Sequence, residues 1–275
     1  MLAAILALCS SLVWGVTDFT GGSLVRRYPV ATVSVLSHGT GFAGMGIVAA
    51  IAGFHGKAFL VGASAGVFGA VSLFAFYKAM SLGTMSVVSP LLSLGSILAF
   101  GLAVAAGDRP SLLAVAGAVV ALGGAILASH GEHASGGDRR TALGWALGSA
   151  CAVGFYLYLL GRAADEGGSV SAVFGSRAVS ASVLLVLALT LRAPLRLSRR
   201  AAAGVLMIGT SGAGALFLFG YAASLGLISI ATILASLYPV VTVLLAHVFV
   251  GERLRGAQLV GVLLALGGVA LVTAS

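Results

Sequence analysis

The sequence consists of long apolar runs separated by short polar or charged segments. Among the breaks are VRRYP at 25–29, GDRP at 107–110 and GERLR at 251–255. The runs do not alternate between polar and apolar residues, as the strands of a membrane β-barrel would. Since a helix needs about 20 apolar residues to cross a bilayer, we predict ten membrane-spanning helices. They lie near 2–22, 30–53, 59–80, 85–106, 111–129, 142–161, 170–191, 202–223, 230–250 and 257–274.

The composition supports an all-α integral membrane protein. Hydrophobic residues make up 60% of the chain and charged residues 8%, whereas a soluble domain carries about 25% charge. The 40 glycines fit helices that pack backbone to backbone in lipid. Residues 1–20 lack a convincing signal-peptide pattern, so we expect this stretch to be the first span.

The net charge of +8 does not indicate nucleic acid as a partner, because the Lys and Arg residues lie between the apolar runs. The expected surroundings are the lipid bilayer. No GxxxxGK[ST] phosphate loop is present. Cys9 and Cys151 lie within spans and have no metal-ligand spacing. We therefore expect no cofactor, no metal and no enzymatic activity.

Two stretches of the chain are copies of one another. SLGTMSVVSPLLSLGS at 81–96 aligns without gaps with SLGLISIATILASLYP at 224–239, 143 positions later. GDR at 107–109 likewise matches GER at 251–253. Upstream the offset becomes 139, so that Ser37-His38 falls on Ser176-Arg177.

Five spans thus repeat as five spans, and an odd number turns the second copy upside down in the membrane. We predict two inverted five-helix repeats, residues 1–138 and 139–275. Inverted repeats of this kind build secondary transporters, with the substrate site where the halves meet.

The chain resembles the drug/metabolite transporter superfamily, EamA type. The resemblance lies in LVWGVTDF at 12–19 and in LASLYPVVTVLLAHVFVGERLRGAQLVGVLLALGGVAL at 234–271, and it covers nearly the whole chain. It implies a ten-helix bundle that moves small metabolites by alternating access, without fixing the substrate. Asp108 stands where the family usually has Glu, and Ser96 stands at the counterpart of Pro239, so the two halves are expected to bend differently.

Hydroxyl side chains recur on one face of both copied stretches. Ser86, Ser89, Ser93 and Ser96 fall within about 80° of arc on a helix, and Ser229, Thr232 and Ser236 within about 60°. A polar stripe on a spanning helix faces a neighbouring helix or a wet cavity. We predict that both stripes line a cavity; close packing is the alternative for each residue. Pro90 and Pro239 fit helices broken beside such a site, or passive kinks.

Ionisable residues within the spans provide the second set of candidates. A lone charge in lipid is costly, so partners are expected. Asp18 can pair with Lys78, while His38 and Arg177 occupy equivalent places in the two repeats. The alternatives are interfacial solvation for Asp18, snorkelling for Lys78 and a packing role for His247.

Aromatic side chains with a polar tip can form the walls of such a site, or simply pack. The candidates are Trp14, Tyr77, Tyr221 and Tyr238. Asp108-Arg109 and Glu252-Arg253 are expected to form structural ion pairs in turns.

The orientation remains open between two interpretations. Ten spans place both termini on the same side of the membrane. Most Lys and Arg residues fall on the opposite side, which the positive-inside rule makes cytoplasmic, whereas the family resemblance implies cytoplasmic termini.

The sequence therefore predicts a secondary transporter for a small-molecule metabolite at the plasma membrane. Export is one of the two directions in which it can work. Proton coupling through Asp18 or His38 is one option. The alternatives are a non-transporting scaffold or channel subunit and, less favoured, a membrane-embedded enzyme, for which no carboxylate pair or histidine cluster is present.

Overall fold

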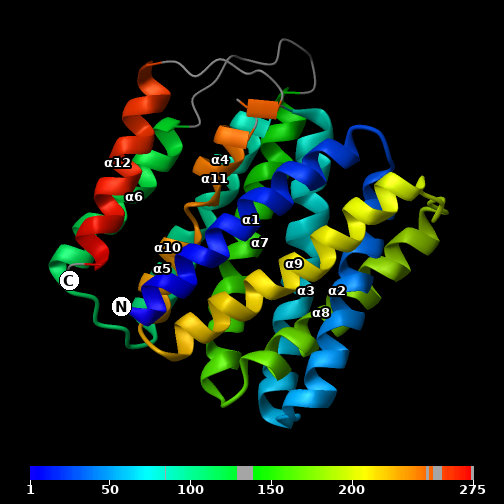
Figure 1. Cartoon of the computed structure of the whole chain (residues 1–275), viewed down its shortest axis with the longest axis horizontal. Coiled ribbons are helices and arrows are strands. Elements are labelled where there is room, and N and C mark those ends of the chain that lie inside the picture. The colour runs from blue at the N-terminus through cyan, green and yellow to red at the C-terminus, as the bar shows by residue number, and fades with distance from the viewer. Residues whose placement is uncertain (84, 129–138, 246–247, 250–255, 274–275) are drawn as a thin grey trace.

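A computed structural model describes residues 1–83, 85–128, 139–245, 248–249 and 256–273. Within these residues the chain forms twelve α-helices and no strand (Figure 1). The helices are α1 (Leu2–Val25), α2 (Val30–Ala52), α3 (Gly56–Leu82), α4 (Met85–Ser93), α5 (Gly95–Ala105), α6 (Leu112–Ala128), α7 (Arg139–Asp165), α8 (Ser169–Thr190), α9 (Arg199–Ser224), α10 (Ile228–Ala235), α11 (Tyr238–Leu245) and α12 (Gly256–Thr273).

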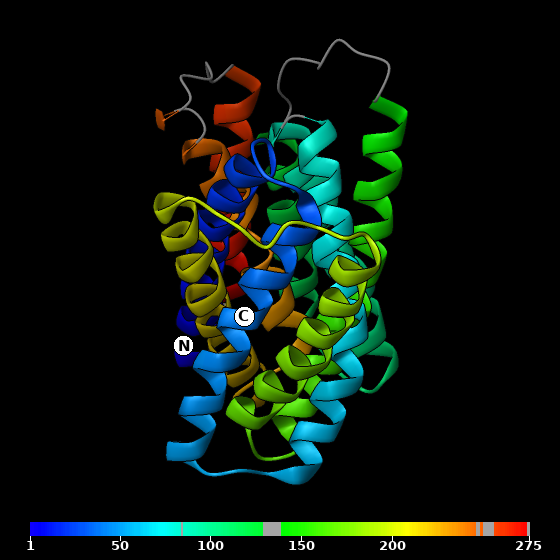
Figure 2. The ribbon, with the colours of Figure 1, turned by 90° about the vertical axis from the view of Figure 1, so that its right-hand side faces the viewer.

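The ten predicted spans are confirmed as an all-helical membrane architecture. In the described part of the chain, α1, α2, α3, α7, α8 and α9 are long and apolar enough to cross a bilayer. The pairs α4–α5 and α10–α11 each form one broken span, and α6 and α12 complete the set. The helices run broadly alongside one another, with most connections gathered at the two ends of the bundle (Figure 2).

The main contacts between helices of the two repeats each have a counterpart in which the repeats have changed places. Helix α3 packs on α7 and α8, and its counterpart α9 packs on α1 and α2. Helices α2 and α8 pack on each other, as do α6 and α12 (Figure 1). In the last pair Gly124 meets the Ala265 backbone and Gly268 meets the Ala121 backbone, leaving no room for a side chain at either glycine. The second five-helix unit is thus an inverted copy of the first.

The two broken spans are interrupted at matching positions. Leu94 separates α4 from α5, and Leu237 lies in the break between α10 and α11. Both breaks contain i→i−3 backbone bonds at equivalent places: the Leu94 N–H donates to the Leu91 carbonyl (3.3 Å), and the Leu237 N–H to the Leu234 carbonyl (3.4 Å).

The two copies are therefore interrupted at the same place, although their prolines stand at different positions. Pro90 lies inside α4, four residues before the break. Pro239 lies in the first turn of α11, where its missing N–H would have had no helical partner.

Asp108 does not have the ion pair expected for its turn. Its Oδ2 atom accepts a hydrogen bond from the Ser229 N–H (2.9 Å), at the start of α10. Arg109 instead donates through Nη1 to the Asp108 backbone oxygen. The carboxylate thus caps a helix of the other repeat. Glu252, Arg253 and His247 lie outside the described residues.

Candidate functional site

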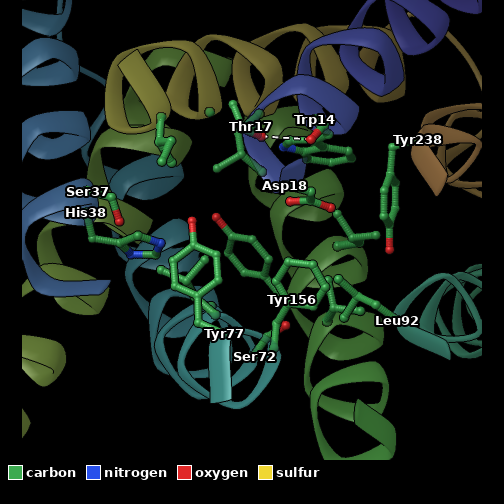
Figure 3. Close-up of a pocket in the computed structure, with 18 of the residues that line it drawn as sticks. Trp14, Thr17, Asp18, Ser37, His38, Ser72, Tyr77, Leu92, Tyr156 and Tyr238 are labelled. Carbon is green, nitrogen blue, oxygen red and sulfur yellow. Dashed lines mark hydrogen bonds between the residues drawn. The ribbon is translucent and has the colours of Figure 1, made fainter. Parts of the chain in front are cut away.

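A cavity lies where the two repeats meet, bounded by α1, α2, α3, α4, α5, α7, α8, α9 and α11 (Figure 3). The space between its atoms measures about 850 Å³, its open mouth included. Both broken spans reach it at their breaks, through Ser93 and Ser96 on one side and Ser236 on the other. The interruptions of the two helices therefore border the cavity, as expected of a site between inverted repeats.

Eight of the predicted site residues line this cavity. They are Trp14, Asp18, His38, Tyr77, Ser93, Arg177, Ser236 and Tyr238. Lys78 lies outside its lining and is half-buried. Tyr221 also lies outside and is 41% exposed, stacked on Phe217. Ser86 lies in α4, and its side chain is outside the described part.

The hydroxyl stripes divide into two parts. At the breaks, Ser96 Oγ donates to the Ser93 carbonyl and Ser236 Oγ donates to the Thr232 carbonyl, both at 2.6 Å. Both hydroxyls are thus bonded within their own broken span, and the Thr232 carbonyl also accepts the Ser236 N–H (3.0 Å). The cavity thus reaches only the end of each stripe.

Away from the breaks, the described residues of the stripes are covered by protein. Ser89, Ser229 and Thr232 are fully buried and do not line the cavity. Their hydroxyl oxygens have no hydrogen-bond partner among the described residues. The prediction that the whole stripe faces a wet cavity is therefore wrong for these three residues in this conformation, because neighbouring helices pack over them.

His38 and Arg177 reach the cavity from equivalent positions on α2 and α8, but their surroundings differ. His38 Nδ1 lies 2.7 Å from Ser180 Oγ, a hydrogen bond between the two repeats. Arg177 is 6% exposed, and its Nε atom has no partner among the described residues. The repeat therefore brings two basic side chains together but satisfies only one of them.

Asp18 and Lys78 do not form the expected ion pair. Among the described residues, the one salt bridge joins Lys57 and Glu166 (2.6 Å) and involves neither Asp18 nor Lys78. Lys78 follows Tyr77 on α3 and therefore points to a different side of that helix from the cavity. Asp18 consequently faces the cavity without a cationic partner from the described chain.

The cavity wall is aromatic around Asp18. Trp14 lies next to Asp18 in Figure 3, and the Trp14 and Tyr238 rings meet edge to face with centroids 6.3 Å apart. Tyr77 and Tyr156 stand between this region and His38 (Figure 3). The space therefore offers a carboxylate at one side, basic groups at the other and aromatic surface between them.

The sequence analysis missed several lining residues, chiefly Thr17, Ser37, Ser72 and Tyr156. Thr17 and Ser37 adjoin predicted residues, so their neighbours were the available signal. Tyr156, whose hydroxyl lies 3.3 Å from Ser176 Oγ, carries no such signal: it sits in a uniformly apolar run. Only the packing of α7 against α3 and α8 turns it toward the cavity.

Comparison with known proteins agrees with this architecture. The sequence profile of the EamA-like transporter family matches residues 1–130 and again residues 140–274. A solved structure titled "Crystal structure of protein" is similar over 99% of this chain and 97% of its own, with a TM-score of 0.78 and 20% identity, and therefore supports the fold. The comparison with curated proteins finds no match.

Proposed function

Because the chain belongs to the EamA-like transporter family, we propose that it is a secondary transporter that moves a small metabolite by alternating access. The family makes it a membrane transporter of the drug/metabolite type and not an enzyme. The main support for alternating access is the position of the cavity: both repeats line it and both helix breaks border it. Rocking of inverted repeats about such a site exposes it to each side in turn.

The site residues in this proposal are those that face the cavity. Asp18, Trp14 and Tyr238 lie on one side of the cavity and His38 on the other (Figure 3). Arg177 also lines the cavity. Ser93 and Ser236 offer hydroxyls at the breaks. A small metabolite with polar groups on an apolar or aromatic body fits this mixture of charge and ring surface.

Purified protein in liposomes tests the proposal. We expect flux of labelled metabolites that saturates with concentration and accelerates when unlabelled substrate is present on the far side. A channel would give flux that rises linearly, and a scaffold would give none. Vesicles loaded inside or outside identify the direction of net transport, and we test export first.

We further propose proton coupling through Asp18. Its carboxyl group faces the cavity and has no cationic partner among the described residues, so it can bind a proton or a substrate cation there. An imposed pH gradient should drive flux in the native protein. Asp18→Asn should lose this drive while retaining exchange of substrate for substrate; a gradient response that persists in the variant would contradict the assignment.

The transporter is proposed to lie in the plasma membrane, with both termini on one side. Helix α1 begins and α12 ends on the same side of the bundle (Figure 1). A reporter fused after Ser275 and assayed on intact cells decides between cytoplasmic and external termini.

A further inference from the structure

Arg177 is a buried cation that has no ion-pair partner among the described residues. Its guanidinium lines the central cavity and forms no ion pair or side-chain hydrogen bond with a described residue. The side chain is 6% exposed, and a guanidinium stays protonated in proteins. An unpaired charge in such a place is retained where a ligand completes it.

Comparison of the two repeats explains why Arg177 lacks the kind of side-chain partner that His38 has. At the 139-residue offset His38 corresponds to Arg177, and Ser180, the partner of His38, corresponds to Gly41. A Cβ atom at Gly41 would lie 3.5 Å from Arg177 Nε, but only 2.8 Å from the Gly209 carbonyl oxygen. The close crossing of α2 and α9 therefore excludes a serine where a partner for Arg177 would stand.

A second glycine lies close to the Arg177 guanidinium. A Cβ atom at Gly212 on α9 would lie 3.6 Å from Arg177 Nη2. Two glycines thus lie close to the guanidinium, and neither offers a side chain to bind it. Tyr77 and Tyr156 are near enough to interact electrostatically with Arg177. Their phenol groups are neutral, however, and do not balance its positive charge.

We infer that Arg177 is the oxyanion receptor of the cavity and that the transported metabolites carry a carboxylate. A guanidinium binds a carboxylate through two parallel hydrogen bonds, and one positive charge balances one negative charge. The aromatic side chains around the cavity contact the remainder of the substrate. This inference rests on the proposed transport function and assigns the substrate class of the same site.

Binding to the full-length protein in detergent tests the inference with acid–amide pairs. The probes are acetate and acetamide, 3-phenylpropionate and 3-phenylpropionamide, and β-alanine and its amide. We expect acids to raise the thermal unfolding midpoint while the matching amides do not. Inorganic phosphate serves as a further arm, and stronger stabilisation by phosphate than by any acid would overturn the carboxylate assignment.

The variants separate recognition from structure. Arg177→Met should weaken acid binding at least tenfold, while its ligand-free midpoint stays equal to the native value or rises, because an unpaired charge is removed. Arg177→Lys keeps the charge but loses the two-pronged geometry, and should retain weaker binding. Arg200→Met, the same change at an exposed position on α9, should behave as native.

Besides stronger stabilisation by phosphate, three results would overturn the inference: no acid stabilises the native protein, amides match acids, or Arg177→Met binds acids as the native protein does. If Arg177→Met does not fold, the acid–amide comparison and Arg177→Lys still decide. Liposome flux is a separate measurement. Saturable flux without acid selectivity removes the Arg177 assignment alone, and acid binding without any flux removes the transport proposal.

Discussion

The two repeats share one frame but place different chemistry on it. In α1, Gly15 packs against Val241, and in the equivalent helix α7, Gly154 packs against Leu98. Both pairs of positions are related by the repeat. The tight contacts that set the helix spacing are therefore duplicated, since both halves must solve the same packing problem in lipid.

The cavity-lining positions on these same two helices differ. Trp14 and Asp18 of α1 correspond to Val153 and Leu157 of α7, and all four residues line the cavity. One half supplies a carboxylate and an indole where the other supplies aliphatic side chains. The comparison teaches that packing preserves the symmetry of this fold, whereas the recognition of an asymmetric small molecule requires that symmetry to be broken at the site.

Filling both helix breaks at once should have the largest effect. Ser93→Leu together with Ser236→Leu places two bulky side chains in the cavity from equivalent positions, and we expect substrate flux in liposomes to be abolished. Because the two sites are equivalent, each single variant should lose a comparable share. Normal flux in a folded double variant would refute this cavity as the transport site.

Making the first repeat resemble the second at Asp18 should have the next largest effect. Asp18→Leu copies Leu157 and removes the carboxylate from the cavity, so we expect initial flux to fall by about tenfold, the equivalent of roughly 1.4 kcal/mol. Asp18→Asn, which removes the charge but keeps the side-chain volume, is the matched control and should lose flux driven by a pH gradient as well. Gradient-driven flux that is retained in Asp18→Asn but lost in Asp18→Leu would show that volume, not charge, matters at this position.

Enlarging the glycine at the duplicated helix contact should destabilise the protein to the same degree in both repeats. A Cβ atom at Gly15 would lie 3.0 Å from the Tyr238 carbonyl oxygen and 2.7 Å from a Val241 methyl carbon. One at Gly154 would lie 2.7 Å from the Gly95 carbonyl oxygen. We expect Gly15→Ala and Gly154→Ala each to lower the free energy of unfolding by about 1–3 kcal/mol through overpacking.

The matched control for these two variants is Gly148→Ala. This position lies on α7 with nothing within 4 Å of an added Cβ atom, so its change should be neutral or mildly stabilising. Unfolding in mixed detergent micelles measures all three. A large loss at one glycine of the pair and none at the other would contradict a shared frame.

Removing a hydroxyl from the buried part of the stripe should have the smallest effect, and it should stabilise the protein instead of destabilising it. Thr232→Val removes a buried hydroxyl that has no partner among the described residues and should raise the free energy of unfolding by about 1 kcal/mol. In Thr242→Val the hydroxyl lost is bonded to the Tyr238 carbonyl (3.1 Å), so stability should fall by about 1 kcal/mol. A fall in both variants would show that Thr232 is paired in solution.

The number and limits of the spans could be predicted because each helix must be apolar over its own length. Helices α2 (Val30–Ala52) and α8 (Ser169–Thr190) begin and end within a residue of their predicted limits. Self-alignment likewise predicted the inverted repeat and brought His38 and Arg177 to equivalent positions. These features are local or periodic, so a single chain records them.

Which side chains meet was decided by tertiary structure alone. Helical spacing placed Ser89 and Ser93 on one stripe, but only helix packing leaves Ser93 at the cavity and covers Ser89. Asp108 was expected in a local ion pair and instead caps α10 of the other repeat. In a bundle whose helices are apolar all round, the rotation of each helix depends on small residues at crossings far apart in the chain, and that information exists only once the helices have packed.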